Sequence, residues 1–227
     1  MASDFAAPRD EAELLARARA LSGMSLGELA ARHGRVAPED LRRAKGFVGE
    51  LVERALGAVQ GPRPGPDFAE LGVELKTLPV DARGRPVEST FVCTLPLRRV
   101  GDLEWLDSPV RKKLRRVLFV PVEGERERRV PERRIGAPLL WSPSDEEEAD
   151  LKFDWDELSG RVGRGDVETI TAHLGRYLQV RPKAKDSRAL GRAFDADGAG
   201  FATLPRGFYL RALFTARIVR EHYALGA

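Results

Sequence analysis

The chain has 227 residues, 42% of them hydrophobic, so it can bury a sizeable core as one domain or as two closely packed lobes. A net charge of +3 permits nucleic-acid binding without establishing it. A single cysteine excludes an internal disulfide, three scattered histidines argue against a zinc site, and no apolar run is long enough to cross a membrane. Because the N-terminus carries no cationic and apolar leader, the sequence predicts a cytoplasmic protein.

The first third of the chain is predicted to be helical. An apolar stripe over residues 14–21 indicates one helix, a capping box over residues 25–28 starts a second, and a third opens at Pro38 and runs towards Gly57. On this third helix Lys45 and Glu53 share one face, where they could form a simple structural pair.

Strand-like runs follow a Pro- and Gly-rich connector over residues 61–66. Residues 73–78 and 90–95 flank a turn at residues 81–84, and this pattern predicts a β-hairpin. Two more strands are expected, at residues 116–120 and 137–141.

The last third mixes helices with one further strand. A capping box at residues 144–147 starts a helix that reaches about Leu158, a shorter helix is expected over residues 167–173, and a strand over residues 177–180. A final amphipathic helix carries on one side Leu210, Phe214 and Ile218. Helices, then a mixed sheet, then helices again predict an α/β or α+β fold.

The most informative residues are Asp67, Glu74 and Lys76. If residues 73–78 form a strand, Glu74 and Lys76 lie on one face and Val73 and Leu75 on the other, while Asp67 enters from the preceding loop. Two carboxylates beside an anionic phosphodiester are repulsive unless they hold a divalent cation that neutralises the phosphate and activates a water. The pattern therefore indicates a metal-dependent endonuclease.

Oxygen ligands select a hard ion, and Mg²⁺ keeps waters available for attack, with Mn²⁺ as a substitute. The backbone carbonyl of Leu75 is a plausible third ligand beside the carboxylates of Asp67 and Glu74, and Lys76 can orient the attacking water. The motif alone is short enough to arise by chance, so a surface strand with an ordinary charge pair stays open.

Two basic runs lie near this motif in the sequence, at residues 111–116 and 126–134. Either run can be an ordinary solvated surface. Because both runs lie near an acidic metal motif in the sequence, contacts with DNA phosphates are favoured.

Several segments, in order along the chain, are similar to the MutH family of DNA mismatch-repair endonucleases. These segments are residues 21–23, 26–30, 67–69, 71–77, 90–93, 121–126, 138–143, 181–184 and 204–210. The resemblance covers nearly the full length and is far more specific than the metal motif.

The resemblance implies a restriction-endonuclease-like fold, a mixed β-sheet flanked by helices, with two lobes around a DNA cleft. It implies one domain over residues 1–227, with a helical region at 1–60, a catalytic sheet at about 67–142 and a base-reading region at about 143–227. It also implies a bacterial monomer that uses Mg²⁺ to nick the unmethylated strand of hemimethylated GATC in double-stranded DNA. MutL would stimulate this nicking after mismatch recognition by MutS.

Carried onto matching positions, the resemblance assigns roles to individual residues. The catalytic set is Asp67, Glu74 and Lys76, and near it lie Glu53, Lys45 and Lys113. The DNA-binding set is Arg181, Pro182 and Lys183, which read bases, Phe91, which probes the DNA, and Tyr209, which senses adenine methylation. Arg and Lys suit the O6 and N7 atoms of guanine. Without the resemblance, the two cations are phosphate contacts or loop residues, and the two rings are core aromatics.

Two rival functions remain at this point. A GATC-specific type II restriction endonuclease shares the fold and the motif, but cuts both strands and needs no activator. A DNA-binding module with a decayed site is the second rival, and the intact Asp67, Glu74 and Lys76 argue against it.

Overall fold

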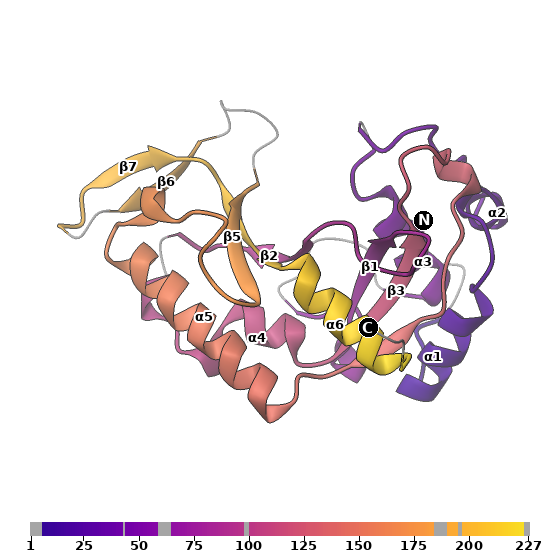
Figure 1. Cartoon of the computed structure of the whole chain (residues 1–227), viewed down its shortest axis with the longest axis horizontal. Helices are drawn as coiled ribbons and strands as arrows, with labels where there is room; N and C mark the ends of the chain where they lie inside the picture. The colour runs from indigo at the N-terminus through magenta and orange to yellow at the C-terminus, as the bar shows by residue number, and fades with distance from the viewer. Residues whose placement is uncertain are drawn as a thin grey trace. The chain divides into compact units, whose positions relative to one another are not determined.

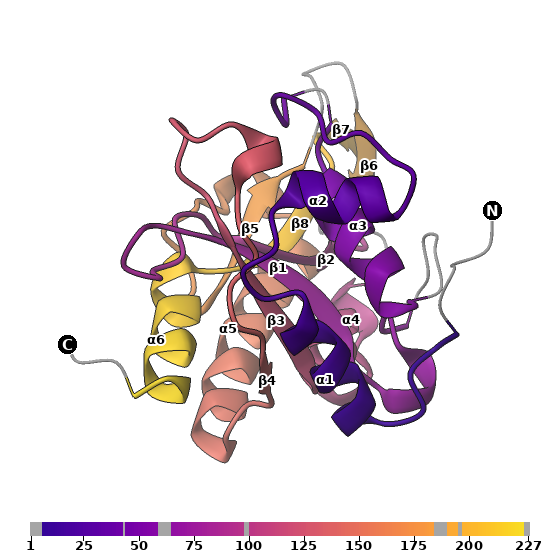
Figure 2. The ribbon, with the colours of Figure 1, turned by 90° about the vertical axis from the view of Figure 1, so that its right-hand side faces the viewer.

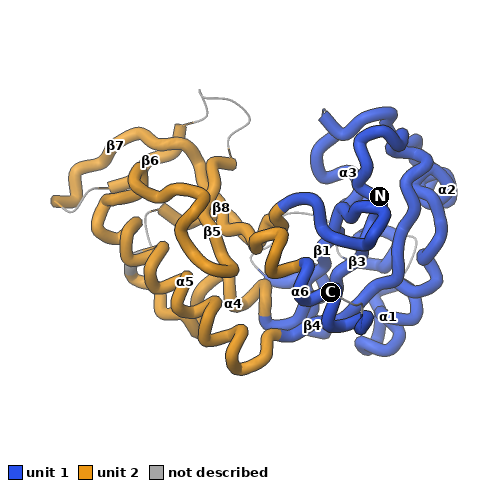
Figure 3. The backbone as a smooth tube through the Cα atoms, in the orientation of Figure 1, with its two compact units in different colours: residues 1–88, 115–142, 216–227 blue, residues 89–114, 143–215 orange. Residues whose placement is uncertain are grey.

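The computed structural model describes residues 6–42, 44–58, 65–97, 100–183, 190–194 and 197–224. Most of the expected connector, residues 61–64, and Ala184 of the DNA-reading segment lie outside this described part. Within it, helices and small sheets alternate along the chain, which confirms the predicted mixed α/β class (Figure 1). The chain divides into two compact units (Figure 3): unit 1 comprises residues 1–88, 115–142 and 216–227, and unit 2 comprises residues 89–114 and 143–215.

Unit 1 begins with three helices, α1 (Glu11–Ala20), α2 (Leu26–Arg32) and α3 (Phe47–Leu56). The predicted capping box of Ser25 and Glu28 is present and starts α2. The prediction that the third helix opens at Pro38 is wrong. Gly46 takes a left-handed φ of 95°, which a continuing helix cannot contain, so α3 starts only at Phe47.

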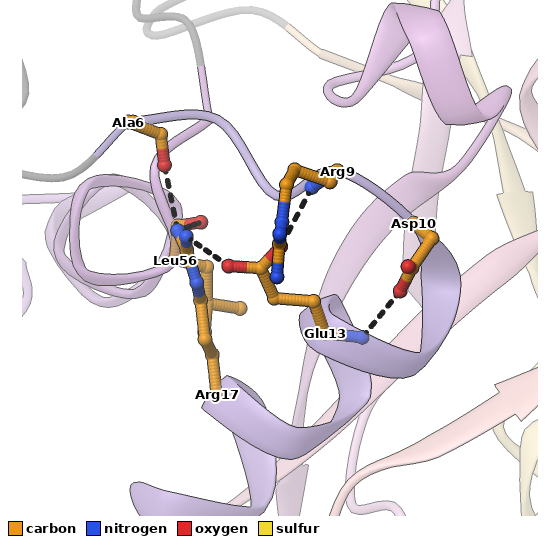
Figure 4. Close-up of polar contacts among 6 residues, drawn as sticks. All are labelled: Ala6, Arg9, Asp10, Glu13, Arg17 and Leu56. Atoms are coloured by element: carbon orange, nitrogen blue, oxygen red, sulfur yellow. Dashed lines mark hydrogen bonds and ion pairs between the residues drawn. The ribbon is translucent and has the colours of Figure 1, made fainter.

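Polar contacts fix the start of α1 (Figure 4). Asp10 accepts the backbone N–H of Glu13 at 2.7 Å, which caps the helix. The guanidinium of Arg17 binds the Glu13 carboxylate at 2.6 Å and donates to the carbonyl oxygens of Ala6 and Leu56 at 2.6 and 3.4 Å. One arginine thus ties the first described residues and the last residue of α3 to α1.

The sheet of unit 1 has the order β1-β3-β4, with β1 (Glu74–Val80) parallel to β3 (Val117–Glu123) and β4 (Leu139–Trp141) antiparallel to β3. The central strand β3 is apolar and buried over most of its length, as expected of a strand covered on both faces. Helices α1, α2 and α3 gather on one side of this sheet (Figure 2), and α3 packs against β1.

The predicted hairpin between residues 73–78 and 90–95 is wrong, although both segments are strands. The turn itself exists, because the N–H of Gly84 binds the carbonyl of Asp81 at 2.9 Å. Beyond it, however, β2 (Thr90–Thr94) joins the sheet of unit 2. β1 instead pairs with β3, an apolar parallel partner that comes later in the chain, and local alternation cannot reveal such a partner.

The main sheet of unit 2 has the order β2-β8-β5, with β5 (Leu178–Pro182) and β8 (Arg206–Leu210) running antiparallel to each other. Helices α4 (Pro109–Leu114) and α5 (Asp145–Gly163) precede β5. The predicted capping box of Ser144 and Glu147 starts α5, as expected. A second, two-stranded sheet pairs β6 (Gly191–Phe194) with β7 (Gly200–Thr203).

Two predictions for this last third need correction. Residues 167–173 were expected to form a helix, but only the 3₁₀ turn Val167–Thr169 forms there. Leu210 was expected on the final helix, yet it ends β8, and α6 (Ala212–His222) begins after it. The sequence before α6 is therefore a central strand, because Arg206–Leu210 finds partners on both edges.

A buried carboxylate on α5 holds the entry to β5. Asp154 is 1% exposed and accepts the backbone N–H groups of Arg176, Tyr177 and Leu178 at 2.7, 2.7 and 2.8 Å. The guanidinium of Arg211 binds the neighbouring carbonyls, among them that of Gly175 at 2.9 Å. Two charged side chains thus provide hydrogen-bond partners for backbone N–H and C=O groups of the segment that leads into β5.

Replacing Asp154 by alanine is expected to lower the free energy of unfolding by about 3 kcal/mol or more, because three N–H groups lose their acceptor. Thermal denaturation followed by circular dichroism measures this loss. Asp156 is a matched control, since it is an exposed aspartate on the same helix. Its alanine variant should stay within about 0.5 kcal/mol of the unsubstituted protein, and equal losses in the two variants would contradict the anchoring role of Asp154.

Candidate active site

A tight loop delivers Asp67 to the start of β1. The N–H of Phe68 binds the carbonyl of Val73 at 2.9 Å, and the chain between them turns through Gly72 at a left-handed φ of 67°. This closure lets Asp67 Oδ2 accept the backbone N–H of Leu75 at 2.9 Å and leaves Oδ1 outside that bond. The carboxylate that the sequence expected to enter from the loop therefore lies against β1.

Glu74 and Lys76 share one face of β1, as their alternation predicted. Lys76 Nζ lies 2.5 Å from Glu74 Oε1. Their side chains are only 16% and 2% exposed, so this is a largely buried ion pair. Removing either partner alone leaves a desolvated charge, which is costly. The alternative of an ordinary surface charge pair does not describe this geometry.

Glu53 of α3 lies in the electrostatic field of the same residues. Burial raises the pKa of the Glu53 carboxyl, and the negative charges of Asp67 and Glu74 raise it further, whereas Lys76 lowers it. The raised pKa reflects burial first and the nearby acidic side chains second, a combination found at many functional sites. Glu53 thus joins the three motif residues from a separate element.

Lys45 and Lys113 were also assigned to this centre, and they lie on other elements. Lys45 is exposed in the turn before α3, so it does not share a helical face with Glu53 as predicted. Lys113 lies on α4 in unit 2. Their assignment to the catalytic centre stays a prediction.

The donor set of the cluster suits a hard divalent cation. The ligands predicted for it are the carboxylates of Asp67 and Glu74 and the backbone carbonyl of Leu75, all of them oxygen atoms. Within the described residues, no group of three or more acidic, histidine or cysteine side chains is arranged to hold a metal ion. A site of two carboxylates and one backbone carbonyl is compatible with that finding.

The proposed DNA-reading residues gather on the main sheet of unit 2. Arg181 and Pro182 end β5, Lys183 follows, and Phe91 and Tyr209 lie opposite each other on β2 and β8. The two rings meet edge to face, with centroids 5.3 Å apart. Both rings are half-buried, which separates them from the fully buried aromatic residues of the core. Burial also raises the pKa of the Tyr209 hydroxyl, while Arg181 lowers it.

Arginines in the second basic run, residues 126–134, form contacts within unit 1. Arg129 binds Glu39 at 2.8 Å, Arg128 binds Glu123 at 3.2 Å, and Arg134 donates to the carbonyl of Gly23 at 2.6 Å. These contacts favour the alternative of an ordinary surface for that run.

Comparison with known proteins agrees with this arrangement. A family model described as "DNA mismatch repair enzyme MutH" matches residues 56–154, which include Asp67, Glu74 and Lys76. The "DNA mismatch repair protein MutH" of Salmonella paratyphi C and that of Salmonella choleraesuis are each 55% identical over 218 residues, or 96% of this chain and 94% of each relative. The protein of the same name from Escherichia coli O6:K15:H31 is 52% identical over 96% of this chain and 95% of its own length. The chain belongs to the MutH family.

This membership confirms the predicted function class. The protein is a DNA endonuclease of mismatch repair, and its mixed α/β fold is consistent with the restriction-endonuclease-like fold of that family. DNA is therefore its partner, and a divalent metal requirement follows for a nuclease of this family. Across the described residues, no helix is long and apolar enough to cross a membrane.

Proposed function

We propose that the enzyme nicks the unmethylated strand of hemimethylated GATC sites in double-stranded DNA, with Mg²⁺ as its cofactor. The observation that carries the proposal is the convergence of Asp67, Glu74 and Lys76 at the start of β1 in a chain of the MutH family. Arg181, Lys183, Phe91 and Tyr209 are proposed to read the site.

Each residue of the cluster has a defined part in this chemistry. Asp67, Glu74 and the carbonyl of Leu75 would hold the cation, which, when bound, neutralises the phosphate and lowers the pKa of a water. Lys76 orients the attacking water and offsets the negative charge that develops on the phosphorus. Glu74 holds the Lys76 ammonium in place through their ion pair. Glu53 adds a further carboxyl beside these groups, and its pKa is raised by burial and by the neighbouring carboxylates.

Strand discrimination is proposed to come from unit 2. The donors of Arg181 and Lys183 suit guanine O6 and N7 in the major groove, where an N6-methyl group on adenine is also exposed. Tyr209 would lie against that adenine and Phe91 would contact the DNA beside it. Their edge-to-face contact supports a common role, because the two rings form one half-buried surface.

The proposed partners follow from the family. MutL would stimulate nicking after MutS recognises a mismatch, and the enzyme would act as a monomer because one metal centre cuts one strand. The bacterial cytoplasm is the proposed location, since the chromosome is found there.

The decisive experiment uses supercoiled plasmids with unmethylated, hemimethylated or fully methylated GATC sites, incubated with Mg²⁺ with and without MutL. The proposal predicts nicked circles from the first two substrates, little product from the third, and faster nicking with MutL. Linear product from the unmethylated plasmid, independent of MutL, would identify a type II restriction endonuclease instead. Binding without any cleavage would indicate a DNA-binding module.

The identity of the ion gives a separate prediction. Ca²⁺ is larger than Mg²⁺ and accepts looser geometry, so it should support tight, specific GATC binding without hydrolysis, whereas Mn²⁺ should support cleavage. Gel-shift and nicking assays after chelation and re-addition of each ion measure the two effects. Robust cleavage in EDTA, or a requirement for Zn²⁺, would contradict the two-carboxylate site.

A further inference from the structure

The side chain of Arg181 crosses the central strand of its sheet. Arg181 lies on β5 and is paired with Gly207 of β8, which separates β5 from β2. Its Nη1 atom nevertheless donates to Oγ of Ser89, the residue immediately before β2, at 2.8 Å. Its Cζ atom lies 5.8 Å from the centroid of the Tyr209 ring. The guanidinium is thus held at a hydroxyl two strands away from its own backbone.

Gly207, the cross-strand partner of Arg181, leaves space for a neighbouring ring. Its φ is not in the left-handed region, so the backbone alone would accept other residues. A Cβ atom at this position would lie 2.8 Å from Cε2 of Phe91 and 3.1 Å from the backbone oxygen of Cys93. Because the glycine has no side chain, the edge of the Phe91 ring can lie against β8.

The Phe91 ring in turn supports Lys183. The ammonium nitrogen of Lys183 lies 3.6 Å from the ring centroid and 3.5 Å from Oγ1 of Thr94, at the end of β2. A cation over an aromatic face is attracted by the ring quadrupole. Any displacement of Phe91 therefore also moves the surface on which Lys183 lies.

We propose that Ser89 and Gly207 are positioning residues of the DNA-reading surface. Ser89 fixes the guanidinium of Arg181, and Gly207 leaves the room in which Phe91, and with it Lys183, is held. Ser89 and Gly207 act before DNA binds. An exposed arginine or lysine loses rotamer freedom when it binds DNA, and this entropy cost is smaller for a side chain that the free protein already holds in one place. The inference rests on the proposed function, in which Arg181, Lys183 and Phe91 read DNA.

The hydroxyl of Ser89 can be tested with a conservative pair of variants. Ser89→Ala removes the acceptor, whereas Ser89→Thr keeps it. Steady-state nicking is measured on a hemimethylated GATC duplex and on a duplex with one base pair of the site changed. Ser89→Ala should raise KM on GATC about threefold to tenfold, and should lower the GATC preference by a similar factor, with a smaller change in kcat. Ser89→Thr should restore both values to within about twofold of the unsubstituted enzyme.

Gly207→Ala tests the space beneath Phe91, and Gly191→Ala is its matched control. Gly191 is also a strand glycine of unit 2, but a Cβ there meets its nearest neighbour, the oxygen of Thr203, at 3.7 Å, an ordinary contact. Gly207→Ala should lower the GATC preference about tenfold or more, and Gly191→Ala should leave it unchanged. If Gly207→Ala folds poorly, the Phe91→Ala background decides: with the ring gone, adding Gly207→Ala should reduce the preference little further.

Arg181→Ala separates the reading role of Arg181 from the positioning role of Ser89. If Arg181→Ala keeps full GATC preference, the proposed reading role is wrong and this inference falls with it. If Arg181→Ala loses the preference while Ser89→Ala keeps it, the reading role stands and the positioning role of Ser89 is overturned. Equal loss in Ser89→Ala and Ser89→Thr would likewise show that the hydroxyl does not matter, and equal effects of Gly207→Ala and Gly191→Ala would remove the role of Gly207.

Discussion

Replacing Lys76 or Asp67 by alanine is expected to reduce nicking at least about 100-fold while DNA affinity stays within about one order of magnitude. The nicking rate should fall because Lys76 acts on the attacking water and Asp67 on the cation. DNA affinity should change little because phosphate contacts elsewhere supply most of the binding free energy. Glu74→Ala should behave in the same way, since it removes a carboxylate and the partner of Lys76. Single-turnover nicking and gel-shift titration in Ca²⁺ measure the two quantities separately.

Glu70 provides the control for these variants. It is an exposed acidic residue in the 3₁₀ turn between Asp67 and Glu74, so Glu70→Ala makes the same chemical change within the same loop. Its nicking rate should stay within about twofold of the unsubstituted enzyme. Residual nicking above roughly a few per cent in the Asp67, Glu74 or Lys76 variant would show that the centre is wrongly assigned.

Truncating Tyr209 is expected to abolish methylation discrimination. If the ring lies against the target adenine, an N6-methyl group on that strand displaces it, so discrimination arises from repulsion as much as from attraction. Tyr209→Ala should lose activity on unmethylated and hemimethylated DNA and lose less on fully methylated DNA. The ratio of rates therefore falls towards one. Parallel nicking assays on the three plasmids give this ratio directly.

Tyr209→Phe assigns the discrimination to shape or to a hydrogen bond. A preserved ratio in this variant assigns it to the ring, and a collapsed ratio assigns it to the hydroxyl. If Tyr209→Ala keeps the unsubstituted ratio and only melts at a lower temperature, Tyr209 is simply a packing residue beside Phe91 and its role as a methyl sensor is wrong.

Elements governed by local chemistry could be predicted from the sequence, and elements governed by distant partners could not. Both capping boxes, at Ser25 and Ser144, start helices where expected, because their hydrogen bonds join residues three apart. The predicted hairpin does not form because β1 pairs with β3 and β2 pairs with β8, both of them later in the chain. The prediction of the third helix was wrong at its start: residues 38–42, 44 and 45 are not helical, and α3 begins only after Gly46, which has a left-handed conformation.

The candidate site divides in the same way. Strand alternation was enough to place Glu74 and Lys76 on one face, and Asp67 is close in sequence and reaches β1 through the loop before it, although their catalytic roles stay predictions. Asp154 and Ser89 carried no sequence signal. Asp154 meets its N–H donors 22 to 24 positions away, and Ser89 meets Arg181 at a separation of 92. These contacts form only once unit 2 has folded.

The division of the chain into units has a consequence for how the protein is made. Unit 1 draws on three separate stretches and unit 2 on two, so the backbone passes between them at residues 88/89, 114/115, 142/143 and 215/216. During synthesis, β1 leaves the ribosome long before its partner β3, and the stretch from residue 216 onwards comes last of all. Unit 2 has all of its residues once residue 215 is made, whereas unit 1 stays incomplete until the stretch from residue 216 has followed, and neither unit is a single contiguous stretch of the chain. Unit 1, which supplies the first residues of the chain, therefore cannot finish folding before unit 2 has been synthesised.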